Sequence, residues 1–185
     1  MQAFVAPHFA DEPAAPERPK LQCVTFNLGG ELFGIEIRHV REIVELDTLT
    51  AVPMMPPFVR GIINLRGRIV PVIDLALRFG QEATALQAST CVAVLRMLDA
   101  TGACELGVLL DSVGEVLDIP LDELDPAPSF GARIRAEFIQ GIATLGQRPA
   151  VILDAERALS LAELAALAEA LLDSPPAPQS PRYER

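Results

Sequence analysis

Two histidines and two aspartates are the residues whose types and positions could support phosphoryl chemistry. His39, in the run IRHVREI, is of the type that accepts phosphate in a relay, whereas His8 lies in a terminal tail. A phosphorelay histidine needs a helical bundle around it, and the residues near His39 indicate strand and turn. Asp74 resembles a phosphate-accepting aspartate at a strand end, but Asp154 occupies the same place in a second copy of the motif. Because both precede helix-like segments, N-capping explains both more simply.

Other catalytic and metal-binding patterns are missing from the sequence. It contains no glycine-rich phosphate loop, no GxSxG turn and no zinc-ligand spacing. The cysteines form no CxxC pair, and we expect them to be small buried core residues: Cys23, Cys91 and Cys104. We therefore expect no enzymatic activity, no cofactor and no bound metal. An enzyme with an unrecognised pocket is the alternative, and it would need titratable side chains that converge in a cleft.

One small unit occurs twice in the sequence. Residues 58–79 (FVRGIINLRGRIVPVIDLALRF) match residues 138–159 (FIQGIATLGQRPAVILDAERAL) at a constant offset of 80 positions. Two upstream segments, which begin at Gly34 and Gly107, match at an offset of 73. Duplication of a small β-unit suggests a binding scaffold rather than a single catalytic pocket.

Short strands dominate the predicted secondary structure. Apolar runs such as 69–73 (IVPVI) predict strands covered on both faces, about five per unit, and small barrels meet that requirement. A leucine-spaced helix follows, which either packs its apolar face on a barrel or binds a partner. The predicted segments are a disordered tail at 1–19, subdomain one at about 21–80, subdomain two at about 88–155, a C-terminal helix at 159–173 and a disordered tail at 174–185.

The chain is acidic, with a formal net charge of −10 and a single lysine, Lys20. This balance argues against binding of nucleic acid or of an anionic membrane surface. Residues 31–80 contain six arginines and six acids, whereas residues 81–160 contain five arginines and twelve acids. The asymmetry serves solubility alone, or it gives two docking surfaces with different partners. We find no secretory signal and no apolar run of ~18 residues, and we expect a soluble, cytoplasmic protein.

Arg66 is the best local indication of function. It is predicted at the tip of a hairpin, where its side chain reaches solvent, and its counterpart in the second unit is Gly146. The fold therefore does not require arginine at this turn. Glu42 is a weaker candidate because its counterpart, Glu115, is also acidic.

The run GIINLRGRIVPVIDL closely resembles the signature of CheW-like domains, and FGIEIRHVREIVEL and GVLLDSVGEVLDIP resemble two further segments of that family. The resemblance covers about 20–161 and implies an all-β fold of two SH3-like five-stranded barrels packed together. It implies a non-enzymatic adaptor that couples methyl-accepting chemoreceptors to a CheA-type histidine kinase in chemotaxis signal transduction. The alternative is a CheW-like adaptor of a non-flagellar chemosensory system, such as pilus motility, biofilm or developmental control.

The resemblance also implies partners and site residues. The cytoplasmic tip of the receptor would dock between the barrels, at the positions that match Val40, Glu42, Gly61 and Arg66. The kinase regulatory domain would bind barrel ends, and adaptor and kinase would alternate in rings. The protein would be recruited from the cytoplasm to membrane receptor arrays, without direct membrane insertion.

Overall fold

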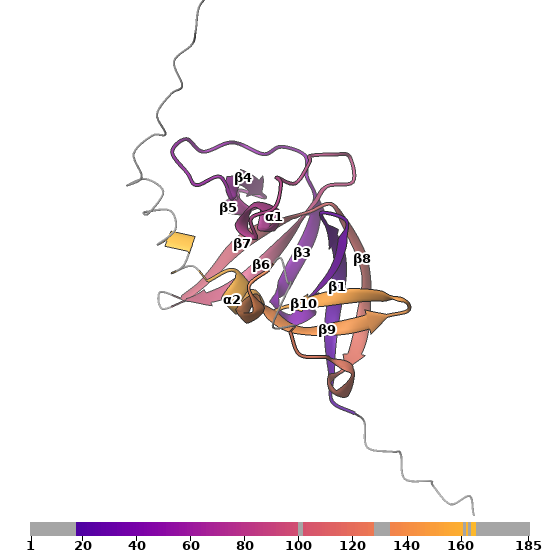
Figure 1. Cartoon of the computed structure of the whole chain (residues 1–185). Helices are drawn as coiled ribbons and strands as arrows, with labels where there is room; N and C mark the ends of the chain where they lie inside the picture. Colours follow the sequence, from indigo (N-terminus) through magenta and orange to yellow (C-terminus); the bar gives the residue numbers. More distant parts are fainter. Residues whose placement is uncertain (1–17, 100–101, 128–133, 161, 163, 166–185) are drawn as a thin grey trace, which may run out of the picture.

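The computed structural model describes residues 18–99, 102–127, 134–160, 162, 164 and 165. Ten strands dominate this part of the chain (Figure 1). The strands are β1 (Lys20–Leu28), β2 (Glu31–Glu36), β3 (Val40–Glu45), β4 (Val59–Leu65), β5 (Arg68–Ile73), β6 (Cys91–Asp99), β7 (Gly102–Leu110), β8 (Ser112–Pro120), β9 (Ile139–Leu145) and β10 (Arg148–Leu153). The helices are α1 (Leu75–Arg78), α2 (Ala155–Ala158) and the 3-10 turns η1 (Ile37–His39), η2 (Leu121–Glu123) and η3 (Ala136–Phe138).

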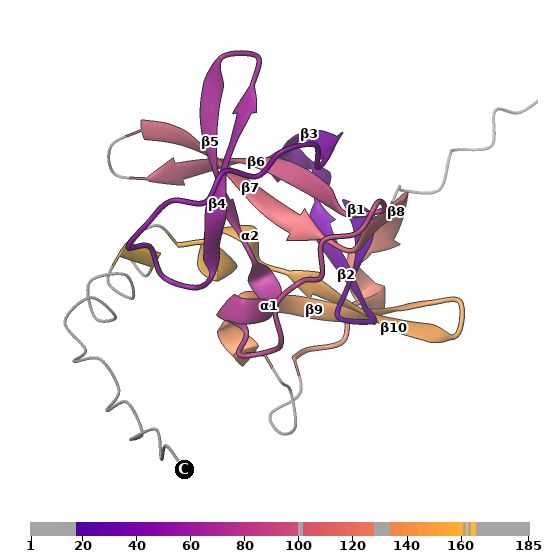
Figure 2. The same cartoon turned by 90° about the horizontal axis from the view of Figure 1, so that it is seen from above.

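The strands form two five-stranded sheets of the same design. Barrel I has the order β8-β1-β2-β10-β9, and barrel II has the order β3-β6-β7-β5-β4 (Figures 1 and 2). One bridge closes each sheet: Thr50 pairs with Ile62 in barrel II, and Asp125 pairs with Ile142 in barrel I. At each bridge the two backbones exchange hydrogen bonds of 2.8 and 2.9 Å. The predicted all-β fold with two five-stranded barrels is confirmed.

Each barrel takes strands from both repeats. In the duplication β1–β5 correspond to β6–β10, and barrel I joins β1 and β2 to β8, β9 and β10. Two equivalent parallel contacts connect the repeats: Ile152 lies opposite Gly34, and Val72 lies opposite Gly107. The predicted subdomains thus follow the repeats but not the barrels, because β2 and β7 complete their hydrogen bonding with a strand of the other repeat.

The apolar core consists of three clusters, one between the barrels and one inside each barrel. The largest lies between the sheets and contains four phenylalanines whose successive ring centroids are 5.8, 6.4 and 6.0 Å apart: Phe26, Phe33, Phe79 and Phe138. A smaller cluster fills barrel II, namely Ile63, Val70, Val72, Val92, Val94 and Leu109. Another fills barrel I, namely Cys23, Ile119, Ala143, Ala150 and Ile152. Because the large cluster belongs to both sheets, its burial fixes the barrels relative to each other.

An aspartate caps the short helix at the end of each repeat. Asp74 accepts two hydrogen bonds from backbone N–H groups of α1, and Asp154 accepts one from α2. The predicted N-capping is therefore confirmed. Asp74 is fully buried, where it also binds Arg60 and Thr84, so the alternative phosphate-accepting role has no access from solvent.

The predicted tails and C-terminal helix fall largely outside the described residues. Residues 162, 164 and 165 of the predicted helix are described and helical. Leu164 is buried in the central cluster, and its N–H donates to the Ser160 carbonyl at 2.9 Å. At this residue the apolar face packs on the barrels, which is the first of the two predicted roles.

Candidate partner-binding surface

Arg66 lies at the tip of the β4–β5 hairpin in a backbone conformation that favours glycine. Arg66 and Gly67 form a two-residue turn with φ angles of 51° and 86°. The left-handed region costs an L-residue about 1 kcal/mol, and the equivalent turn between β9 and β10 places Gly146 there, with φ 66°. The Arg66 side chain is 80% exposed, as the sequence predicts. Arg66 is thus strained and exposed at a position where the repeat has glycine, so the turn itself does not require arginine.

Arg66 belongs to a chain of ion pairs across one end of barrel II. Its guanidinium lies 3.5 Å from Glu42, which also pairs with Arg68 at 3.2 Å. Arg68 pairs in turn with Glu105, and Glu105 also pairs with Arg41. These five residues are called the charged mouth. Both carboxylates are 19% exposed, whereas Arg66 and Arg41 are 80% and 49% exposed, so the inner acids position arginines that reach the surface.

Strand alternation explains why the charged mouth forms. Side chains two positions apart share one face of a strand, and the inward column of each strand changes from apolar to charged at the same end of barrel II. Along β5, buried Val70 is followed at the mouth by Arg68; along β7, buried Leu109 shares a face with Glu105. The charges lie where solvent reaches the barrel end, which avoids the cost of burying them fully.

A β-bulge separates two of the predicted site residues. The register between β3 and β6 shifts after Val40, which lies opposite Leu95, so that Glu42 lies opposite Val94. The bulge turns the two side chains toward opposite faces of the sheet. Val40 packs against the central cluster, whereas Glu42 joins the charged mouth. Of the four predicted site residues, Glu42 and Arg66 form an ion pair with each other.

Gly61 has an internal role that the sequence does not predict. It is buried, its φ is 149°, and a Cβ there would lie 2.3 Å from the Thr50 carbonyl oxygen. This close approach allows the adjacent Ile62 to bridge to Thr50 and close barrel II. The expected role of Gly61, as a position near the docking surface where a side chain would obstruct the receptor, stays a prediction; a side chain there would first meet the barrel's own backbone.

The groups that could do covalent or metal chemistry are not assembled in the described part of the chain. There, no three His, Cys, Asp or Glu side chains are placed to hold a metal ion. Burial, and to a smaller degree the Glu36 carboxylate, raises the pKa of the Cys23 thiol to about 11. His39 lies in the 3-10 turn η1 beside strands, as predicted. Among the described helices, none is long and apolar enough to cross a membrane.

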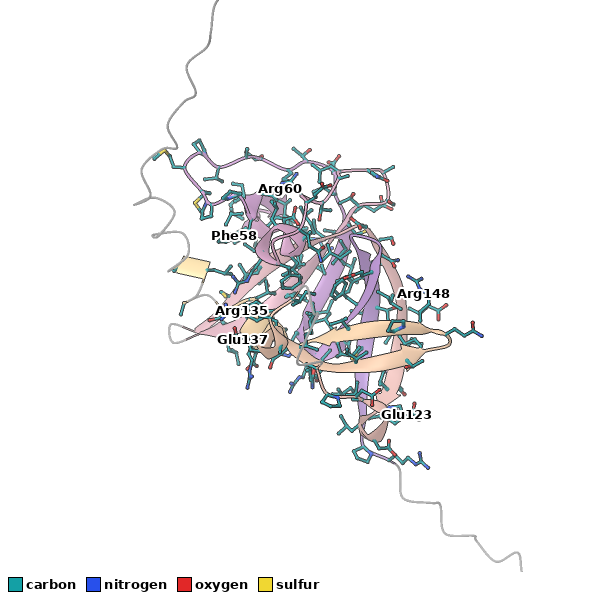
Figure 3. All side chains as sticks on the ribbon, viewed as in Figure 1. Phe58, Arg60, Glu123, Arg135, Glu137 and Arg148 are labelled. Atoms are coloured by element: carbon teal, nitrogen blue, oxygen red, sulfur yellow. The ribbon has the colours of Figure 1, made fainter. Side chains whose placement is uncertain are left out.

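Sequence reasoning missed three members of the charged mouth. Arg68 has an identical counterpart in Arg148, so comparison of the repeats does not single it out as functional. Arg148 lies at the β9–β10 hairpin of barrel I (Figure 3). Glu105 was detectable, because the offset of 73 aligns it with Leu32 and places a charge within an apolar strand. Arg41 is the bulged residue of β3, and a bulge leaves no mark in the alternation of apolar residues.

Known proteins resemble this chain over most of its length. The family model described as CheW-like domain matches residues 22–163. The chain is 37% identical over 140 residues to the chemotaxis protein CheW of Klebsiella aerogenes, covering 76% of this chain and 82% of that protein. It is 30% identical over 129 residues to the protein FrzA of Myxococcus xanthus, covering 70% and 78%. The crystal structure of the scaffolding protein TtCheW from Thermoanaerobacter tengcongensis superposes with a TM-score of 0.66 at 32% identity, covering 80% of this chain and 90% of that one.

Proposed function

This chain belongs to the CheW-like domain family, and from that premise we propose that it is a non-enzymatic adaptor that couples methyl-accepting chemoreceptors to a CheA-type histidine kinase. The observation that carries the proposal is the family match over 22–163, which spans both barrels. An adaptor holds two macromolecules in fixed geometry and changes neither covalently. Two barrels with different surfaces suit two different partners.

The receptor's cytoplasmic tip docks, in this proposal, between the barrels, on the side of the molecule that carries the charged mouth. Glu42 and Arg66 are contact residues. Val40 is a third, and its side chain lies on the opposite face of β3 from that of Glu42. Gly61 supports this surface indirectly, because the absence of a side chain there allows the Thr50–Ile62 bridge to close barrel II. The support is the contrast at the turns: Arg66 occupies a backbone conformation that Gly146 adopts without strain.

The kinase regulatory domain binds the barrel ends, and adaptor and kinase assemble into rings beneath the receptors. Such contacts are expected to be small, below ~1,200 Å² in total, and weak individually. Multiple attachment in an array then supplies the stability that single contacts lack. A head-to-tail contact between unlike surfaces closes into a ring when its rotation allows. The protein is accordingly cytoplasmic and is recruited to membrane arrays through its partners.

Co-purification with a CheA-type kinase and a receptor cytoplasmic-tip fragment, followed by a kinase assay, tests the coupling. We expect the receptor fragment to change kinase activity only when this protein is present. Arg66→Ala and Glu42→Lys should abolish that response while the melting temperature stays near that of the wild type. Equal responses with and without the protein would overturn the adaptor role, and wild-type receptor pull-down by both variants would overturn the site.

A second candidate is an adaptor of a non-flagellar chemosensory system. The similarity to the protein FrzA, whose name differs from that of the CheW relatives, favours this second candidate. The fold and the docking surface are the same in both cases, and only the receptors differ. Deletion of the gene separates the two: loss of swimming chemotaxis supports the first, and an intact swimming response with altered surface motility or biofilm supports the second.

A further inference from the structure

A cationic hollow lies beside the charged mouth, on a protein that is otherwise acidic. Arg38, His39, Val40, Arg41 and Arg96 line this hollow, whose volume is about 370 Å³. It brings together η1, the start of β3 and the middle of β6. Three guanidinium groups around one concavity contrast with a chain whose formal net charge is −10. The local charge therefore differs in sign from the charge of the whole molecule.

The acids near the hollow are already committed to other groups. Glu36 pairs with Arg38 at 2.8 Å and also accepts a hydrogen bond from Gln140. Glu105 pairs with Arg41, but it is shared with Arg68 outside the hollow. The hollow thus keeps an excess of positive charge.

Arg96 is the arginine with spare hydrogen-bonding capacity. It is exposed, and it lies opposite Glu105 in the pairing of β6 with β7. Nevertheless, within the residues that the structure describes it forms no ion pair within 4.0 Å. Its five N–H donors favour planar, bidentate recognition of a carboxylate. In barrel I the equivalent position, opposite Leu32, is Asn27, so the strand pairing does not require a cation there.

We infer that this hollow receives a carboxylate from an acidic side chain of the receptor's cytoplasmic tip, with Arg96 as its principal ligand. The inference rests on the proposed function, because the hollow shares Val40 with the predicted receptor surface. Apolar Val40 lines it and Ile37, 37% exposed, lies in the same turn as Arg38, so the acidic residue of the partner is flanked by an apolar one. A single carboxylate fits better than a polyanion, which the acidic remainder of the chain repels.

Binding of a receptor cytoplasmic-tip fragment, measured by isothermal titration calorimetry at two salt concentrations, tests the inference. Arg96→Gln should weaken binding about 5-fold, and Arg96→Glu about 10-fold or more, with a smaller salt dependence in both. The matched control is Arg148→Glu, which makes the same charge change at an exposed position of barrel I. This control should bind within about 2-fold of the wild type. Thermal melts establish that each variant is folded.

The outcomes separate the hollow from the proposed receptor site. If Arg96→Glu binds as the wild type does while Arg66→Ala fails, the hollow has no ligand and the adaptor proposal stands. If neither variant alters receptor binding, both docking assignments are wrong. An equal loss in Arg148→Glu and Arg96→Glu would show an effect of net charge alone and would also overturn the hollow.

Discussion

The two barrels share one strand order but differ at their equivalent ends. The mouth of barrel II joins Arg66, Glu42, Arg68, Glu105 and Arg41 by ion pairs. The equivalent positions of barrel I are Gly146, Glu115, Arg148, Leu32 and Gly114. Within the described residues, neither Glu115 nor Arg148 forms an ion pair. The same backbone therefore forms with and without the charges, so they are not a requirement of the fold.

At this end, barrel I uses neutral hydrogen bonds where barrel II uses ions; an ion pair of barrel I, between Lys20 and Asp118, lies at the other end of the β1–β8 pairing. Thr25 Oγ1 donates to the Glu115 carbonyl and accepts from the Glu115 N–H, both at 2.9 Å, and Asn27 donates to Ser112 at 3.0 Å. These contacts tie β1 to β8 without placing charge at the surface. Exposed ion pairs contribute little to stability, typically about 0–1 kcal/mol. A contribution to stability therefore does not by itself explain the charged mouth.

The largest expected difference in stability between the barrels concerns the glycines beside the bridges that close them, Gly61 in barrel II and Gly141 in barrel I. A Cβ at Gly61 would lie 2.3 Å from the Thr50 carbonyl oxygen, whereas a Cβ at Gly141 would lie 3.2 Å from the Asp125 carbonyl oxygen. Gly61 also has a φ of 149°, a conformation that alanine rarely adopts. We expect Gly61→Ala to destabilise by about 3 kcal/mol and Gly141→Ala by about 1 kcal/mol. Denaturant unfolding of the two variants measures both changes. Equal losses in the free energy of unfolding would show that the backbones approach equally closely at the two bridges.

The sequence predicted the parts of this comparison that depend on local patterns. The repeated Asp74 and Asp154 predicted the helix caps, and the pair Arg66 and Gly146 predicted an exposed turn. The exchange of strands was not predictable, because an offset between repeats identifies equivalent strands but not which copy they pair with. That choice is made by long-range packing in the central cluster. The bulge that turns Val40 away from Glu42 is likewise a property of the β3–β6 pairing.

A smaller difference in stability between the barrels is expected at high pH, because barrel I buries the thiol of Cys23 at the position where barrel II buries Val92. Burial raises the pKa of the Cys23 thiol from its ordinary value of 9.0 to about 11 in the folded protein. The protonated thiol therefore stabilises the fold fully below pH 9, and this contribution is lost as pH rises toward 11. We expect the wild type to lose roughly 2 kcal/mol over that interval relative to Cys23→Val.

Urea unfolding of both proteins at pH 8, 9.5 and 10.5 measures this loss. Cys23→Val makes the barrels alike at this position and removes the thiol, so any alkaline loss that remains belongs to other groups. Identical pH profiles for the two proteins would mean that burial does not hold the thiol protonated. Cys91 and Cys104, which are only partly buried, are left unchanged in both proteins.

The smallest expected change in stability comes from Arg66→Gly, which copies the barrel I turn onto barrel II. Relief of the left-handed arginine offsets the lost pair with Glu42, so stability should stay within about 1 kcal/mol of the wild type. The reverse change, Gly146→Arg, introduces that strain in barrel I and should destabilise by about 1 kcal/mol. Melting curves of the two variants measure these effects.

The receptor measurement is what makes this pair of variants informative. Arg66→Gly should lower affinity for the receptor fragment about 10-fold, because it removes a proposed contact residue and leaves the turn relaxed. Gly146→Arg should leave affinity unchanged, since barrel I lacks the other members of the charged mouth. A variant that gains stability and loses its partner would show that strain at Arg66 is retained for recognition. Retained affinity in Arg66→Gly would instead leave the difference between the two turns without a function.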